Sequence, residues 1–334
     1  MQVWAVDRFG QRPFAVTNAL PVFDNPSGTA LIVINSARDH VVVATLGLQA
    51  GVPVLVEKPL ALNEADVKRL IDLAAVSDVP LAAGHALRFA RYLHNFAVAL
   101  TSAGELAALQ VRWEDVRAEA RYGEVKSYDS SIPVFVDCLP HVVSMIEALV
   151  QVDLISLGKV QIRRGGAEVE IHAHVNDIPV SIVLARNAMQ RKRVIEATLR
   201  DGSKTTLDFQ QEPGFIQSSE GTMAADTLWN LEQRPLATML TAFLAGVQGT
   251  VWDSRLSPML ALRVAKLVDQ IQPYYAAQLV NWVCDAVSYP DSSLDKNELD
   301  YALRELLQAQ NPCLEGDLNK QIQLYLSARS LTHD

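Results

Sequence analysis

Residues 30–59 read ALIVINSARDHVVVATLGLQAGVPVLVEKP, and this stretch decides the fold class. It opens with an uninterrupted apolar run, which is typical of a strand buried on both faces of a parallel sheet. Asn35 and Ser36 then offer the N-cap of a helix, and Gly51 offers its end. A second apolar strand leads directly into Glu-Lys-Pro. Strand, helix and strand in this order predict a parallel sheet with crossover helices.

The flanking segments continue the alternation. QVWAV at 2–6 is typical of a strand, and LAAG at 81–84 is typical of a buried one. Asn63 offers the N-cap of the helix that precedes LAAG, and the apolar residues of this helix recur at helical spacing. The pattern predicts an α/β domain over residues 1–98.

Beyond about residue 104, apolar and polar residues alternate with period two. The alternation runs through 108–119, 160–187 and 194–209. Three hairpin turns are expected along it, at Gly165-Gly166, Asn176-Asp177 and Asp201-Gly202. The sequence therefore predicts an α+β domain over residues 99–273 with an open-faced, largely antiparallel sheet.

Helical patterns return in the last part of the chain. Ser257 and Pro258 are typical of a helix start, and we expect Pro273 to end that helix. Residues 295–298 resemble a capping box ahead of leucines at helical spacing. We expect closing helices for the second domain and a helical C-terminal extension over 274–334.

Composition narrows the class of protein. The chain has 334 residues, is 49% hydrophobic and carries a net charge of −9. This charge argues against a nucleic-acid partner, which a basic face would attract. No apolar run reaches the ~18 residues of a membrane span, and the first residues lack a signal-peptide pattern. The three cysteines are far apart, and His172 and His174 share a strand face without a third ligand. We expect a cytoplasmic protein that binds small molecules, no membrane and no metal.

Lys58 is the first candidate for chemistry. It follows a buried strand, so it lies at the carboxyl edge of the predicted sheet, where open α/β folds bind ligands. A partly desolvated lysine there can exchange a proton with a substrate oxygen, and Pro59 restricts its backbone. The alternative is a solvated Lys-Pro turn at the end of a strand.

Asp137 and His141 form a second candidate. They are four residues apart at the start of an amphipathic helix, so both can lie on one face. A neutral histidine there can exchange a proton near physiological pH. The alternative is that Asp137 caps the helix and His141 only packs.

His85 and Arg88 form a third candidate. They follow the strand at 81–84 and could line the same edge as Lys58. The alternative is a loop whose arginine makes a local salt bridge.

Together these motifs resemble the glucose-fructose oxidoreductase / inositol dehydrogenase / rhizopine-catabolism (Gfo/Idh/MocA) family. VLVEKPLAL at 54–62, GHALRF at 84–89 and DCLPH at 137–141 occur in the family's order. The segments at 234–249 and 253–271 resemble the family's closing helices. The resemblance covers roughly residues 2 to 272.

The resemblance implies a Rossmann domain over residues 1–98, an open-faced sheet domain for substrate and oligomer contacts, and a homo-oligomer. It also implies NAD(P)-dependent oxidation or reduction of a sugar, cyclitol or related polyol. Lys58 matches the family's acid/base lysine, and Asp137 and His141 match the pair beside the reacting oxygen. The cofactor-binding residues implied are Asp7, Asn35, Ser36, His40, Glu57, Lys58 and Pro59. The substrate-binding residues implied are Lys58, His85, Arg88 and His141.

One family feature is absent from the sequence. No G-x-G-x-x-G turn for the cofactor pyrophosphate precedes Asp7, whose strand resembles the family's second strand. A misplaced start and a true loss both explain this, and a true loss leaves a non-catalytic or cofactor-independent relative as the alternative function. The missing strand would expose apolar edges at Val3 and Ile32. Asp7 favours NAD, whereas Arg8 leaves room for the 2′-phosphate of NADP.

Overall fold

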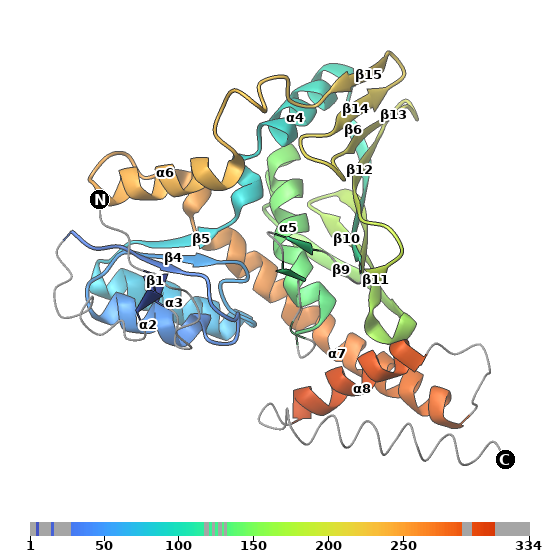
Figure 1. Ribbon diagram of the computed structural model, residues 1–334. Coiled ribbons are helices and arrows are strands. Elements are labelled where there is room, and N and C mark those ends of the chain that lie inside the picture. The colour runs from blue at the N-terminus through green and yellow to red at the C-terminus, as the bar shows by residue number, and fades with distance from the viewer. Residues whose placement is uncertain are drawn as a thin grey trace. The chain divides into compact units, whose positions relative to one another are not determined.

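The computed structural model describes part of the chain, namely residues 5–6, 15–16, 28–116, 120–121, 124–125, 129, 132–288 and 296–310. The chain divides into two compact units. Unit 1 comprises Met1–Phe89 and Leu236–Leu262, and unit 2 comprises Ala90–Pro235 and Arg263–Asp334. Figure 1 labels the main helices and strands of both units.

A parallel sheet forms the centre of unit 1. Its strands in the described residues are β3 (Leu31–Val33), β4 (Val54–Glu57) and β5 (Leu81–Gly84), hydrogen-bonded in that order. Helix α2 (His40–Gln49) connects β3 to β4, and α3 (Glu64–Ser77) connects β4 to β5. The predicted order of strands and crossover helices is therefore confirmed.

The two helices of this sheet begin differently. The side chain of Asn63 accepts a hydrogen bond from the Asp66 amide at 2.8 Å, which confirms the predicted cap of α3. The predicted cap of α2 at Asn35 and Ser36 is wrong, because α2 starts after Asp39 and has no side-chain cap. The Ser36 carbonyl instead accepts the Asp39 amide at 2.8 Å, so the chain completes a turn before it enters the helix.

Strand β3 is more exposed than its apolar sequence suggests. Ile32 is 39% exposed and Ile34 is 73% exposed, so the expected burial on both faces is wrong for this strand. In the described residues, β3 pairs only with β4. The apolar edge expected at Ile32 is therefore confirmed, whereas Val3 lies outside the described residues. The short strands β1 (Ala5–Val6) and β2 (Ala15–Val16) pair in parallel with each other.

Unit 2 contains a larger mixed sheet. In its described residues the strands are β6 (Leu106–Val116), β9 (Ile155–Arg163), β10 (Glu168–Val175), β11 (Ile178–Ala188), β12 (Lys192–Leu199), β13 (Lys204–Asp208), β14 (Phe215–Ser218) and β15 (Gly221–Ala224). They are hydrogen-bonded in the order β15-β14-β13-β12-β6-β11-β10-β9. All neighbours are antiparallel except β6 and β11, which confirms a largely antiparallel sheet.

The hairpin turns fall where the sequence predicts them. Gly165-Gly166 lies in the 3-10 turn η2 (Arg164–Gly166) between β9 and β10. Asn176 has a φ of 53° between β10 and β11, and Gly202 has a φ of 84° between β12 and β13. These left-handed conformations are the reason why asparagine and glycine mark such turns.

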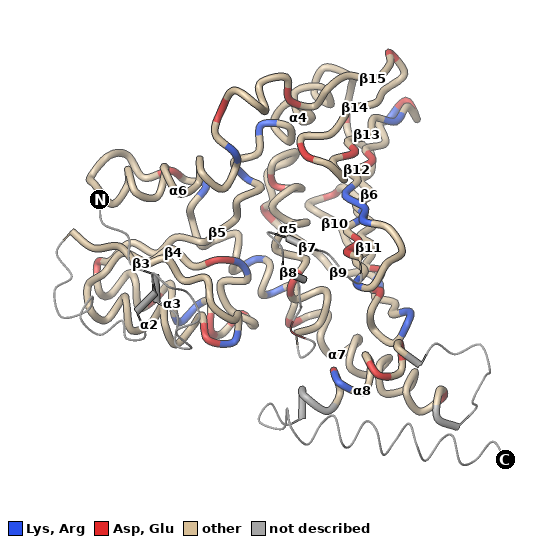
Figure 2. The backbone as a smooth tube through the Cα atoms, in the orientation of Figure 1, with Lys and Arg blue, Asp and Glu red and all other residues tan. Residues whose placement is uncertain are grey.

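Helix α5 (Val134–Leu149) covers one face of this sheet. It packs on β6, β10 and β11, and α4 (Arg91–Ala103) packs against it. Along β12 every second residue is buried. The residues between them include Lys192 and Glu196, and Glu196 pairs with Lys204 of β13 at 2.6 Å. On the neighbouring strand β6, Arg112 pairs with Glu114 at 2.6 Å. Figure 2 shows charged residues of both signs along these strands.

Helix α7 (Met259–Ser288) continues through Pro273, so the predicted end at this proline is wrong. Tyr275 is 1% exposed, and its hydroxyl donates to the Gly166 carbonyl at 3.2 Å. The Gln278 side chain bonds to the backbone of β9 at 3.0 Å. These contacts beyond the proline stabilise the helix despite the hydrogen bond that proline removes.

The C-terminal extension is helical where the structure describes it. Helix α8 (Lys296–Gln310) packs against η2 in unit 2. A Cβ on Gly165 would lie 2.7 Å from the Glu298 carbonyl oxygen, so this close approach requires glycine. Leu299 and Leu303 are buried, as their helical spacing predicts. Asp295, the first residue of the expected capping box, lies outside the described residues.

Candidate active site

The carboxyl ends of β3, β4 and β5 gather the predicted site residues of unit 1 at one edge. Asn35 and Ser36 follow β3, Glu57 and Lys58 end and follow β4, and His85 follows β5. The three strands are parallel, so these residues share the edge where open α/β sheets bind ligands.

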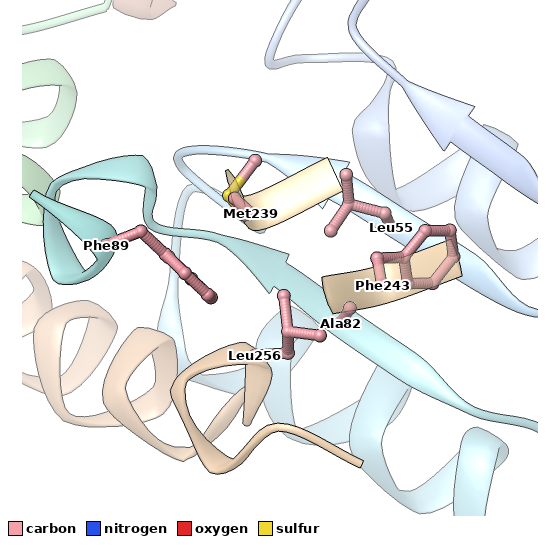
Figure 3. Packing of buried hydrophobic residues seen from close by; sticks show 6 residues of the cluster. All are labelled: Leu55, Ala82, Phe89, Met239, Phe243 and Leu256. Atoms are coloured by element: carbon pink, nitrogen blue, oxygen red, sulfur yellow. The ribbon is translucent and has the colours of Figure 1, made fainter. Parts of the chain in front are cut away.

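A segment from later in the chain, residues 236–262, also belongs to unit 1 and packs on its sheet. Helix α6 (Pro235–Val247) and the turn η3 (Ser254–Leu256) complete the apolar core of unit 1, a return that the local sequence pattern does not indicate. Figure 3 shows the cluster, which consists of Leu55, Ala82, Phe89, Met239, Phe243 and Leu256. Leu55 and Ala82 belong to β4 and β5, so the core fixes the two strands that end in the candidate residues.

Gly84 allows β5 to approach the end of β4. It pairs in register with Glu57. A Cβ at this position would lie 2.8 Å from the Val56 carbonyl oxygen and 3.0 Å from the Glu57 Cα. Both atoms belong to the backbone and cannot rotate away, so glycine is required beside the Glu-Lys-Pro motif.

His40 links two of the strand ends. Its ring is 2% exposed, with Nδ1 2.8 Å from the Pro59 carbonyl oxygen and Nε2 3.1 Å from the Asn35 carbonyl oxygen. Burial lowers the pKa of His40, although both carbonyls act to raise it, and the nearby charge of Lys58 lowers it further. The His40 ring therefore supports the backbone on both sides of the strand ends near Lys58. His40 was expected to bind the cofactor, and in this structure it has a supporting position.

Lys58 and Glu57 are half-buried at the end of β4, and Pro59 is buried. The Lys58–Pro59 peptide is cis. The lysine is partly shielded from water, and its charge acts on the buried ring of His40.

Arg88 contacts the turn η3. It lies in η1 (Ala86–Phe89), and its Nη1 donates to the Arg255 carbonyl at 2.7 Å. Hydrogen bonds from Arg255 lower the pKa of Asp253, and the charge of Arg88 adds to this effect. Arg88 thus fastens the returning segment near the strand edge, while His85 is buried beside it.

In unit 2, Asp137 is held by an arginine of the sheet. The Nη2 of Arg186, on β11, donates to the Asp137 carboxylate at 3.1 Å. The Arg186 side chain is only 3% exposed, whereas that of Asp137 is 32% exposed. Burial acts to lower the pKa of Arg186, but Tyr301 and Asp137 outweigh it and the pKa is raised. The N-cap of α5 is Pro133, so Asp137 is not the capping residue of this helix.

His141 is stacked on Trp113 of β6. Their ring centroids are 4.6 Å apart and the planes are inclined by 15°. The guanidinium carbon of Arg193 lies 3.7 Å from the Trp113 ring centroid. Arg193 is itself fixed, since its Nη1 donates to the Glu114 carbonyl at 2.7 Å and its Nη2 pairs with Asp115. The histidine ring is therefore oriented by a rigid aromatic and cationic layer.

Sequence reasoning missed Arg186, Arg193 and Trp113 as supporting residues. Each occupies a buried position in a strand that alternates buried and exposed residues. An arginine at such a position needs buried acceptors. The sequence signal for the two arginines is a charged residue at a position where the alternating pattern of the strand expects an apolar one.

The structure gathers Asn35, Ser36, His40, Glu57, Lys58, Pro59, His85 and Arg88 in unit 1, and Asp137 and His141 in unit 2. Asp7 lies outside the described residues. Within the described ranges, no group of three His, Cys, Asp or Glu residues could hold a metal ion. In the same ranges no helix is both long and apolar enough to cross a membrane.

Comparison with known families identifies the N-terminal segment. Residues 5–85 match the GFO_IDH_MocA model, described as "Oxidoreductase family, NAD-binding Rossmann fold". YceM of Salmonella typhimurium, which is named as an oxidoreductase, is 37% identical over 87 residues. That match spans 26% of this chain and only 28% of the relative's length.

Solved structures share the fold over most of the chain. GnnA of Acidithiobacillus ferrooxidans, a UDP-N-acetylglucosamine 3-dehydrogenase, has a TM-score of 0.63 at 18% identity, covering 79% of this chain and 83% of that chain. KijD10 of Actinomadura kijaniata, a 3-ketoreductase solved with TDP-benzene and NADP, has a TM-score of 0.58 at 15% identity, covering 79% of this chain and 84% of that chain. The resemblance to the Gfo/Idh/MocA family and the predicted fold class are confirmed.

Proposed function

We propose that this chain is an NAD(P)-dependent oxidoreductase of the Gfo/Idh/MocA type that acts on a sugar, cyclitol or related polyol. The observation that carries the proposal is the half-buried Lys58 at the carboxyl edge of the parallel sheet, within the segment that matches the family model. The activities of GnnA and KijD10, a UDP-N-acetylglucosamine 3-dehydrogenase and a 3-ketoreductase, support a sugar-like substrate.

The residues at this edge fit one end of a dinucleotide. A bound nicotinamide would supply or accept the hydride. Asn35 and Ser36 are exposed beside the start of α2, and Gly84 keeps the backbones of β4 and β5 close at Glu57. These residues would hold the nicotinamide end, and the choice between NAD and NADP depends on the region of Asp7.

Lys58 is the proposed acid and base. Its half-buried position at the carboxyl edge of the sheet suits a group that exchanges a proton with a bound substrate. In the oxidation direction its neutral amine takes the hydroxyl proton of the substrate, and in the reduction direction its ammonium returns that proton.

Asp137 and His141 are proposed to hold the substrate oxygen. The Trp113 stack fixes the plane of the His141 ring, and Arg186 fixes the Asp137 carboxylate. A half-buried imidazole in a fixed plane can donate to or accept from a hydroxyl with little loss of entropy. These residues belong to unit 2, whereas Lys58 belongs to unit 1.

Two measurements test this function. Titration with NADH and with NADPH, followed by nicotinamide fluorescence, should show saturable binding. Turnover of UDP-N-acetylglucosamine and of myo-inositol, followed by nicotinamide absorbance, then compares Lys58→Ala with the exposed control Lys68→Ala. We expect Lys58→Ala to lower kcat by about 100-fold or more while KM changes little. Equal turnover in the two variants would refute the role of Lys58.

A second candidate is a relative that binds a ligand or partner without a dinucleotide. The exposed apolar side chains of Ile32 and Ile34 favour it. Absence of binding to both NADH and NADPH would support this second function and contradict the first.

A further inference from the structure

One buried arginine connects the C-terminal helix α8 to the helix that carries Asp137 and His141. Arg186 donates through Nη2 to the Asp137 carboxylate at 3.1 Å and through Nη1 to the Ile132 carbonyl at 2.7 Å. Its Nη1 also lies 3.5 Å from the hydroxyl oxygen of Tyr301 on α8. A single guanidinium therefore links α8, β11 and the candidate catalytic helix α5.

Glu305 extends this link along α8. It lies one helical turn beyond Tyr301, so both face the same side. Glu305 is 2% exposed and Tyr301 is 3% exposed. Burial raises the pKa of Glu305 to about 7. Interactions with Tyr275, Arg186 and Tyr301 act to lower this pKa, but burial has the larger effect. The acid, the two hydroxyls and the guanidinium thus form one buried polar cluster.

Other contacts dock α8 without this cluster. Glu298 pairs with Arg164 at 3.0 Å, and Arg164 also donates to the Asn187 carbonyl at 2.9 Å. Leu299 and Ala302 are completely buried in the same interface. Removal of one hydroxyl or one charge from the cluster should therefore leave the helix in place.

Packing alone does not account for the cluster. A buried carboxyl group and buried hydroxyls are less favourable than apolar side chains of the same size unless they are well paired. Leucine at these positions would dock the helix more firmly. The polar residues instead lie beside Arg186, which contacts Asp137, and this indicates a role for their polarity.

We propose that Tyr301 and Glu305 are positioning residues, which hold Arg186 and through it orient the Asp137 carboxylate. The proposal rests on the function proposed for Asp137. Nη1 of Arg186 donates to the Tyr301 oxygen at 3.5 Å, and the carboxyl group of Glu305, one turn along α8, lies in the same buried interface. When this acceptor is removed, the guanidinium loses one of the partners that define its plane, and the carboxylate becomes less well oriented.

A double-mutant cycle tests the link without any assay of activity. The melting temperature is measured for Tyr301→Phe, Asp137→Asn and the double variant. Because both residues share Arg186, the shift of the double variant should differ from the sum of the single shifts by about 1–3 °C. Asp300→Asn is the control, since Asp300 pairs with Arg304 at 2.8 Å on the same helix and its shift should add to that of Asp137→Asn. Additive shifts for Tyr301→Phe and Asp137→Asn would overturn the proposal.

Turnover supplies the second readout. Tyr301→Phe and Glu305→Gln should each lower kcat about 3- to 10-fold with an unchanged KM, whereas Asp300→Asn should not. Unchanged kcat in both variants of an enzyme that is inactivated by Lys58→Ala overturns the positioning role. Non-additive melting temperatures in a protein whose turnover survives Lys58→Ala support the cluster and count against the proposed function instead.

Discussion

Replacement of Glu305 by glutamine should change how the stability of this protein depends on pH. Burial raises the pKa of this carboxyl from 4.5 to about 7, although Tyr275, Arg186 and Tyr301 oppose the rise. An acid with a raised pKa in the folded state binds its proton more tightly there than in the unfolded chain. Its contribution to stability is therefore complete below pH 4.5 and is lost as the pH rises to about 7.

The difference between the two pKa values sets the size of this loss. It is 7 minus 4.5, or about 2.5 units, which corresponds to about 3 kcal/mol at roughly 1.4 kcal/mol per unit. Glutamine has nearly the same shape and cannot ionise. The Glu305→Gln variant should therefore lack this decline, and its advantage over the wild type should grow from about pH 5 to about pH 8.

Urea unfolding followed by tryptophan fluorescence, at a series of pH values from about 5 to about 8, measures this difference. Asp300→Asn is the control on the same helix, because it leaves Glu305 in place and should decline as the wild type does. Parallel curves for the wild type and Glu305→Gln would refute the reasoning, since they would show that Glu305 has the same proton affinity in both states.

Three further predictions concern the sheets and a helix. Gly84→Ala should lower the free energy of unfolding by about 2 kcal/mol in a urea titration, because the new Cβ would lie 2.8 Å from a backbone oxygen. Gly47→Ala is the control and should lower it less, because its Cβ would contact only side-chain atoms. Pro273→Ala should raise it by about 1 kcal/mol, because alanine restores a helical hydrogen bond; no gain would contradict this. We propose a homo-oligomer through the face of the larger sheet opposite α5, so light scattering should give a multiple of 36.7 kDa, and a monomer would contradict it.

The sequence predicts those parts of the fold that a few neighbouring residues encode. Asn63 caps α3 because its side chain reaches the amide of Asp66, three positions along. Asn176 and Gly202 mark hairpin turns because the left-handed conformation favours those residue types. The position of Lys58 at the sheet edge follows in the same way, from the end of one apolar run and the rule for parallel strands.

Long-range contacts determine the parts that the sequence does not predict. Pro273 is a strong local stop signal, yet Tyr275 and Gln278 bind α7 to η2 and β9 and carry the helix past it. Ile32 has the sequence environment of a buried strand, and its exposure depends on the neighbours that the strand has in the sheet. Phe243 packs in the core of unit 1, and no pattern in the neighbouring sequence predicts this contact.

Long-range contacts also determine the candidate site in unit 2. Arg186 and Arg193 occupy inward positions of β11 and β12 and are 3% and 2% exposed. A buried guanidinium without acceptors is strongly unfavourable, so the elements that cover this face must supply oxygen atoms. For Arg186 they do so through the carboxylate of Asp137 and the carbonyl of Ile132. The orientation of the candidate catalytic carboxylate is therefore a consequence of a charge placed in the sheet, and a neutral residue at Arg186 would release Asp137 without touching the substrate.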